Sequence, residues 1–258
     1  LHSDGLGYSV VDYNRSSVPL MEIVTAFPPD IASGEEARQY AENLRLVLLY
    51  LGVSDGKMEQ GSLRAEPNPS IRKEGAEAYG TKTELKNLNS FRAVQLGVEY
   101  EARRQEAELE AGKQVLQATY GWDAEKGVTV LQRLKEGEQE YRYFPEPDLP
   151  PLAIDPVWLA AIVAGLPELP GTRRARYVSE LGLTEYDASV LVAEPRAAAL
   201  FEAARAAQKE LDAKLLANWV SGEFLRAAKE GAADPDPIQF AALVAAVASK
   251  EINGTTAK

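Results

Sequence analysis

Residues 82–91 read KTELKNLNSF. A strand over residues 80–88 places Glu84 and Lys86 on one face, because alternate residues of a strand point the same way. A helix then begins after Ser90, a favourable capping residue. A carboxylate and an ammonium group beside a helix N-terminus suit a metal ion and an anionic ligand. The same residues also fit an exposed ion pair beside a helix cap, so this segment leaves both interpretations open.

The sequence on either side of this segment alternates between helix and strand patterns. Ser33 and Glu36 form a capping box, and Gly52 is placed to end the helix that follows. The predicted elements of the first half are a helix over 34–51, strands over 57–72 and 80–88, a helix over 91–111 and strands over 127–134 and 139–144. Pro67, Pro69 and Gly75 are expected to break the first pair of strands. This order predicts an α+β fold.

Composition changes near residue 150. The stretch FPEPDLPPLAIDP, residues 144–156, holds five prolines, and this density predicts an extended connector. Beyond it the chain is rich in Ala, Leu, Glu and Arg. This half predicts helices near 156–164, 172–181, 187–192, 195–209, 212–230 and 236–250.

Bulk properties exclude several classes of protein. The 258 residues carry a net charge of −11, which argues against a broad nonspecific nucleic-acid surface. The chain has no cysteine, so disulfides, thiolate zinc sites and cysteine nucleophiles are excluded. Its single histidine, His2, makes a Ser–His–Asp triad improbable. No apolar run is long enough to span a membrane, and we expect a cytoplasmic location.

Residues 57–68, KMEQGSLRAEPN, carry a second group of polar side chains. As a strand, this segment puts Ser62, Arg64 and Glu66 on one face together with Gln60. Glu59 faces the other way unless a bulge at Gly61 turns it round. Arg can grip a phosphate with two hydrogen bonds, and carboxylates can hold Mg²⁺. A polar outer face of an antiparallel sheet is the competing interpretation.

Two further segments are weaker candidates. In YRYFPEPDLP, residues 141–150, Arg142 and Tyr143 could stack on a base, and Glu146 could help to hold a metal ion. An aromatic strand followed by a rigid linker would look the same. Arg15 lies in a polar turn, DYNR, where it could contact an anion or simply occupy a loop.

These segments together resemble GatB, the component of tRNA-dependent amidotransferases that activates mischarged tRNA. The stretches that carry the resemblance are DYNRSSVPLMEIV, GVSDGKMEQGSLR, GTKTELKNLNSF, RLKEGEQEYRYFPEPDLPPL and LPELPGTRRARYV, in this order. The similarity extends through AKLLANWVSGEFL to INGTTAK and so covers nearly the whole chain. It departs at Gln60 and Glu66, where this family often has Glu and Asp.

The resemblance implies a fold and an organisation. Residues 1–150 would be the C-terminal part of a cradle domain related to the glutamine synthetase fold. Residues 151–232 would form an all-α helical domain, and residues 233–258 the start of a helical tail domain that binds tRNA. An N-terminal part of the family pattern and the end of the tail are missing, so we expect this chain alone to be inactive.

The resemblance also implies chemistry. GatB would use ATP and Mg²⁺ to phosphorylate the side-chain carboxylate of Glu-tRNA(Gln) or Asp-tRNA(Asn), and ammonia from the A subunit, an amidase, would displace the phosphate. The C subunit, the mischarged tRNA and the cognate aminoacyl-tRNA synthetase are the other expected partners. The implied catalytic residues are Glu59 and Glu84, as metal contacts, with Ser62, Arg64 and Lys86; the implied ligand contacts are Arg15, Glu66, Asn87, Asn89, Arg142, Tyr143 and Glu146.

Three arginines in the second half, Arg173, Arg174 and Arg176, are predicted to contact tRNA. A solvated N-terminal helix turn is the competing interpretation. Positive charge in the first turns of a helix is slightly unfavourable, which gives some support to contact with an external anion. A protein that docks tRNA and assembles the complex without chemistry of its own remains an alternative. An unrelated ATP-dependent ligase is a third, although no glycine-rich phosphate loop is present.

Overall fold

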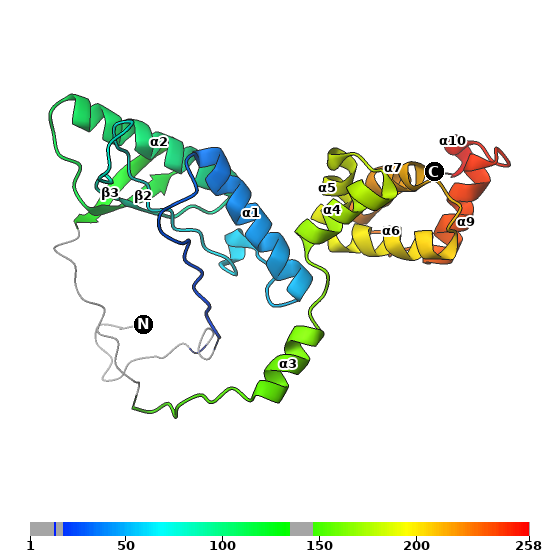
Figure 1. The fold of residues 1–258 in the computed structure, drawn as a ribbon. Coiled ribbons are helices and arrows are strands. Elements are labelled where there is room, and N and C mark those ends of the chain that lie inside the picture. The colour runs from blue at the N-terminus through cyan, green and yellow to red at the C-terminus, as the bar shows by residue number, and fades with distance from the viewer. Residues whose placement is uncertain (1–12, 14–17, 135–146, 258) are drawn as a thin grey trace, which may run out of the picture. The chain divides into compact units, whose positions relative to one another are not determined.

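The computed structural model describes residue 13, residues 18–134 and residues 147–257. The chain divides into two compact units, Leu1–Ala32 and Ser33–Lys258. The described residues 18–32 of the first unit contain no helix or strand. The second unit combines a small sheet with many helices, which confirms the predicted α+β class (Figure 1).

Two long helices of the first half begin and end where local sequence signals predict. α1 spans Gly34–Leu51; the Ser33 side chain accepts a hydrogen bond from the Glu36 amide, and Gly52 ends the helix in the left-handed region, at φ 67°. α2 spans Phe91–Glu110, and the Ser90 hydroxyl caps the Ala93 amide in the same way. α1 and α2 run side by side (Figure 1).

The sheet has three strands in the order β1-β2-β3. β1 (Glu84–Lys86) runs parallel to β2 (Ala118–Asp123), and β2 runs antiparallel to β3 (Val128–Leu134). α2 covers one face of this sheet. At Gly97 of α2 an added Cβ would lie 2.9 Å from Leu88, 3.7 Å from Leu85 and 3.7 Å from Trp122, so the missing side chain lets the helix approach the strands closely.

The predicted strand over residues 57–72 is wrong for most of its length. Met58–Gln60 form a 3-10 turn, labelled η1, which ends at Gly61 with a φ of 76°. Residues 67–69 do run beside β1, because the Pro67 and Pro69 carbonyls accept hydrogen bonds from the Leu85 and Thr83 amides. The two prolines have no N–H to donate in return, so a regular ladder does not form.

The other strand predictions were confirmed only in part. β1 is shorter than the predicted 80–88, since Asn87 adopts a left-handed φ of 63° directly after it. The strand over 127–134 is confirmed as β3. β2 was not predicted at all, and the predicted strand over 139–144 lies outside the described residues.

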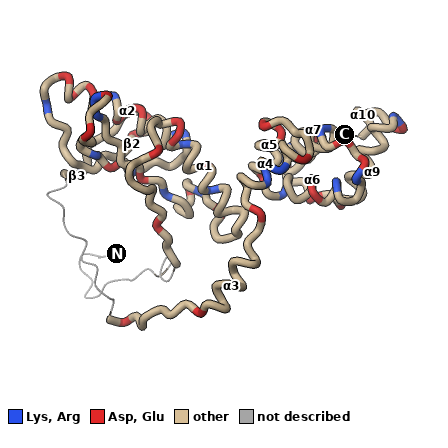
Figure 2. Tube along the Cα trace, viewed as in Figure 1, with Lys and Arg blue, Asp and Glu red and all other residues tan. Residues whose placement is uncertain are grey.

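The second half is helical, as predicted. Its elements are α3 (Pro156–Ala164), α4 (Pro170–Leu181), α5 (Glu185–Ala193), α6 (Pro195–Ala207), α7 (Ala213–Trp219), a π-helical turn η2 (Val220–Phe224), α8 (Leu225–Lys229), α9 (Pro237–Ala248) and α10 (Gly254–Ala257). Phe201, Leu191 and Leu216 are fully buried at the centre of the core formed by α4, α5, α6, α7, η2 and α9. α3 contains no charged residue, has no buried residue, and is uniformly tan in Figure 2. No helix in the described part of the chain is long and apolar enough to cross a membrane.

Candidate functional site

The face of the sheet away from α2 carries a compact group of polar side chains. Lys86 lies 3.7 Å from a Glu84 carboxylate oxygen and 3.7 Å from a Glu66 carboxylate oxygen. The buried Thr119 of β2 donates a hydrogen bond of 2.8 Å to the second oxygen of Glu84. Glu84 and Lys86 therefore share a face as predicted, and Glu66 joins them from the segment before β1. Thr119 was missed, because pairing between distant strands gives no local signal.

Asn87 and Gln132 meet above Gly121, beside this group. A Cβ on Gly121 would lie 2.4 Å from the Gln132 side-chain nitrogen and 3.1 Å from that of Asn87, so both amides occupy space that any side chain at 121 would fill. Asn87 holds its left-handed φ of 63°, which Asn tolerates better than most residues. The glycine thus leaves room for two neutral hydrogen-bonding groups next to Lys86.

The opposite face of the sheet holds a buried carboxylate, Glu101 of α2. It is fully buried and accepts hydrogen bonds from Thr83 at 2.8 Å, from Thr129 at 2.9 Å and from Arg104 at 2.6 and 2.9 Å. Burial acts to raise the pKa of Glu101, but the hydrogen bonds and the charge of Arg104 outweigh it and lower that pKa. Gln105 completes the network by donating to Thr83 and to the Pro69 carbonyl.

This network fastens α2 to β1 and β3 and also to the proline segment that runs beside β1. Thr83 directly precedes Glu84, so the network fixes the strand from which Glu84 and Lys86 project. The sequence pattern gave no indication of it, since a Glu within a helix rich in charged residues is usually solvated.

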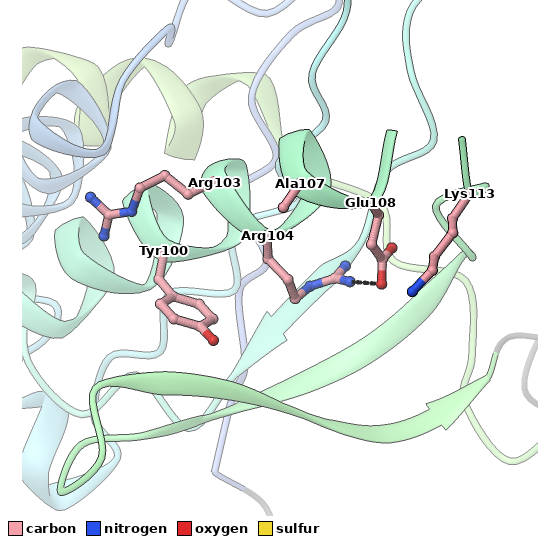
Figure 3. Close-up of a pocket in the computed structure, with 6 residues that line it drawn as sticks. All are labelled: Tyr100, Arg103, Arg104, Ala107, Glu108 and Lys113. Carbon is pink, nitrogen blue, oxygen red and sulfur yellow. Dashed lines mark ion pairs between the residues drawn. The ribbon is translucent and has the colours of Figure 1, made fainter. Parts of the chain in front are cut away.

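A surface pocket of about 410 Å³ lies along α2 (Figure 3). In the figure the Arg104 side chain points along the helix toward Glu108, with which it forms an ion pair of 2.8 Å. The lining residues are Tyr100, Arg103, Arg104, Ala107, Glu108 and Lys113. None of them is a predicted site residue. Arg104 stacks over the Tyr120 ring at 4.3 Å, which places the pocket on the helix side of the sheet, away from Glu84.

The remaining predicted residues are not gathered at the polar face by any direct contact. Glu59 lies on η1 and is exposed, and no hydrogen bond or ion pair joins it to Glu84 in the described part of the chain. Ser62 hydrogen-bonds to Asp55 and thereby helps to lower the pKa of that carboxyl. Arg64 and Asn89 are exposed. Arg15, Arg142, Tyr143 and Glu146 lie outside the described residues.

The described residues do not by themselves form the expected magnesium site. Among them, no group of three or more His, Cys, Asp or Glu side chains gathers where a metal ion could bind. Lys86 pairs with both Glu84 and Glu66, and its positive charge would repel a divalent cation. In the described part of the chain, these three side chains form an ion-pair group in which carboxylates balance Lys86, rather than a set of metal ligands.

The arginine cluster of α4 is held largely by carboxylates of the chain itself. Arg173 and Arg176 donate to Glu168 at 2.8–2.9 Å, and Arg176 also pairs with Glu202. The hydrogen bonds and charges of the two arginines lower the pKa of Glu168 to about 2. Arg174 is half exposed, with its Nε 3.7 Å from Glu185. Of the three, Arg174 is the most accessible to an external phosphate, and the tRNA contact stays a prediction.

Comparison with known proteins shows the family to which this chain belongs. Residues 1–160 match the family described as the GatB/GatE catalytic domain. The chain belongs to this family. Relatives named as the B subunit of aspartyl/glutamyl-tRNA(Asn/Gln) amidotransferase extend the similarity. The protein of Herpetosiphon aurantiacus is 47% identical over 97% of this chain, and that of Moorella thermoacetica is 48% identical over 100%.

The GatB/GatE match includes β1, β2, β3 and every predicted site residue except the three arginines of α4. The chain spans about half the length of the relatives, covering 53% of the Herpetosiphon protein and 55% of the Moorella protein. The resemblance to GatB drawn from the motifs is therefore confirmed at the level of the family.

Proposed function

We propose that this chain forms part of a GatB protein that activates mischarged tRNA for amidation. The observation that carries the proposal is its identity of 47–48% to two such amidotransferase proteins over nearly all of its length. The polar sheet face built around Glu84, Lys86 and Thr119 supports it, since charged groups there are held in place by the fold.

The proposed reaction begins at the side-chain carboxylate of Glu-tRNA(Gln) or Asp-tRNA(Asn). A carboxylate oxygen attacks the γ-phosphorus of ATP, and ADP leaves with the electrons of the broken P–O bond. Ammonia then attacks the acyl phosphate carbon, phosphate departs, and the amide forms after loss of a proton. Such phosphoryl transfer depends mainly on positioning and charge neutralisation, so it needs no histidine or cysteine from this chain.

The polar face would contribute binding and orientation. Glu84, held by Thr119, is the proposed acidic group nearest the reacting atoms, and Lys86 is a proposed contact for phosphate. Asn87 and Gln132 would supply neutral hydrogen bonds beside them. Mg²⁺ would shield the charge of ATP when bound, and its ligands within GatB stay a prediction.

The organisation of the chain is part of the proposal. Residues 1–150 are proposed to belong to the cradle domain, residues 151–232 to a helical domain and residues 233–258 to the start of the tail. tRNA would contact the helical part through Arg174 before Arg173 or Arg176, because these two already bind Glu168. The amidase, the C subunit and an aminoacyl-tRNA synthetase are the proposed partners, in the cytoplasm.

A second candidate is a docking role without chemistry. It is favoured by one observation: the described residues bring no three metal-ligating groups together. In this case the chain would hold tRNA and its partner proteins while phosphorylation depended on residues elsewhere.

The substitution Glu84→Gln in the full-length protein, assembled with the amidase and the C subunit, separates the two candidates. The catalytic proposal predicts that ATP-dependent conversion of Glu-tRNA(Gln) to Gln-tRNA(Gln) is lost, while the thermal midpoint and tRNA binding stay near those of the wild type. Glu74→Gln, at an exposed turn residue, is the matched control and should retain activity. Full activity of the Glu84→Gln complex would exclude Glu84 from the chemistry.

A further inference from the structure

Three residues stand in one row across the face of the sheet that lies away from α2. Glu84 of β1 pairs with Thr119 of β2, and Thr119 pairs with Arg133 of β3. Residues directly opposite one another on neighbouring strands project from the same face. Thr119 makes its hydrogen bond of 2.8 Å to Glu84, which fixes the face in question. The Arg133 side chain therefore leaves the sheet on the side that carries Glu84 and Lys86, away from α2.

The two positive side chains on this face differ in how far nearby carboxylates neutralise them. Lys86 already lies 3.7 Å from each of two carboxylates, those of Glu66 and Glu84. Arg133 is exposed and, within the described part of the chain, forms no ion pair. An anion that reaches this face would find the charge of Lys86 largely balanced and that of Arg133 available.

The row spans the width of the sheet. Neighbouring strands lie about 4.8 Å apart, so the backbones at Glu84 and Arg133 are about 10 Å from each other. The residue between them, Thr119, is buried and donates its hydroxyl to Glu84, so the exposed charge of the row lies at its Arg133 end. Gln132, which directly precedes Arg133 and has no partner in the register, lies above Gly121 on the same face.

We propose that Arg133 binds the phosphate chain of ATP on this face, as a ligand-binding residue additional to Lys86. The planar guanidinium donates two parallel hydrogen bonds to phosphate oxygens, a geometry that an ammonium group does not offer. The inference rests on the proposed function, since it names the residue that holds the nucleotide used there.

The test uses the full-length protein assembled with the amidase and the C subunit. Arg133→Met and Arg133→Lys are compared with Arg103→Met, which removes an exposed arginine of α2 on the other side of the sheet that makes no ion pair among the described residues. Two quantities are measured: the KM for ATP at saturating Glu-tRNA(Gln), and the Kd of magnesium ATP by calorimetry without tRNA. Arg133→Met should raise both on the order of tenfold or more, because a charge-assisted hydrogen-bond pair is lost. Arg133→Lys should recover part of this loss, and Arg103→Met should match the wild type.

The inference is overturned if Arg133→Met, with an unchanged thermal midpoint, leaves the Kd and the KM for ATP as in the wild type. It is also overturned if Arg103→Met weakens ATP binding as much as Arg133→Met, since the effect would then be general electrostatics. If Arg133→Met does not fold, Arg133→Lys decides: an ATP affinity equal to that of the wild type contradicts bidentate binding. Amide formation by the wild type without ATP is a different failure, because it would remove the proposed function itself.

Discussion

Replacing Glu101 with Gln tests whether the buried network positions the polar face. The substitution keeps the volume of a fully buried side chain but removes the charge that faces Arg104. It also turns an amide N–H₂ toward donors, so at least one of the hydrogen bonds from Thr83, Thr129 or Arg104 is lost. Breaking a buried ion pair by removing one partner costs about 3–5 kcal/mol.

The expected cost at this site is lower than that range. Arg104 is partly exposed and keeps its second partner, Glu108, at 2.8 Å, so it is not left unpaired. We therefore expect Glu101→Gln to lower the free energy of unfolding by about 2–4 kcal/mol. Urea unfolding followed by circular dichroism measures it, and the midpoint should fall by roughly 1 M. Glu106→Gln, at an exposed position of the same helix, should change the free energy by less than about 0.5 kcal/mol.

The pH dependence gives the same prediction an independent check. The pKa of Glu101 is lower in the folded protein than in the unfolded chain, so the ionised group stabilises the fold at neutral pH. This contribution is present above the unfolded pKa, near 4.5, and is lost as pH falls through the lower folded value. The stability difference between the wild type and Glu101→Gln should therefore shrink below pH 4.5. An equal stability of the two proteins at pH 7 would refute the assigned role of the network.

Three further predictions concern single groups. Thr119→Val removes the hydrogen bond of 2.8 Å to Glu84, so amidation by the full-length complex should fall about tenfold while the midpoint of thermal unfolding moves little. Gly121→Ala should displace the Gln132 amide, which lies 2.4 Å from the added Cβ, at a cost of about 1–3 kcal/mol in urea unfolding. Because the pKa of Glu168 is about 2, its stabilising effect on α4 should be complete above about pH 4.5 and decline toward pH 2; acid titration of Glu168→Gln, followed by circular dichroism, should lack this component.

The parts of the fold that could be predicted are those coded by neighbouring residues. Ser33, Ser90 and Gly52 mark helix ends through bonds within four residues, and the structure confirms all three. β2 could not be predicted in the same way, since it forms only by pairing with β1 and β3. Residues 57–72 show the reverse case: the alternation of polar residues predicted a strand broken at Pro67 and Pro69, whereas Met58–Gln60 form a 3-10 turn. The two prolines lack the N–H groups that a ladder beside β1 would need.

The candidate site also contains residues that a local pattern predicts and residues that only long-range contacts bring together. Glu84 and Lys86 could be placed on one face because they are two residues apart on one strand. Thr119 lies 35 residues from Glu84, and its contact depends on the register of two strands. Glu101 depends on donors from β3, from its own helix and from the residue before β1, so no local pattern marks its burial. Long-range pairing supplied what the sequence could not show.

The most direct test of the central proposal is ATP-dependent amidation of Glu-tRNA(Gln), measured with ammonia, the amidase and the C subunit. The full-length protein and the present 258-residue chain are assayed side by side, after both are shown to bind tRNA and the partner proteins. We expect Gln-tRNA(Gln) with the full-length protein only, and only when ATP is present. Amide formation by the full-length complex without ATP, or none at all by a complex that is assembled and bound to tRNA, would contradict the proposal.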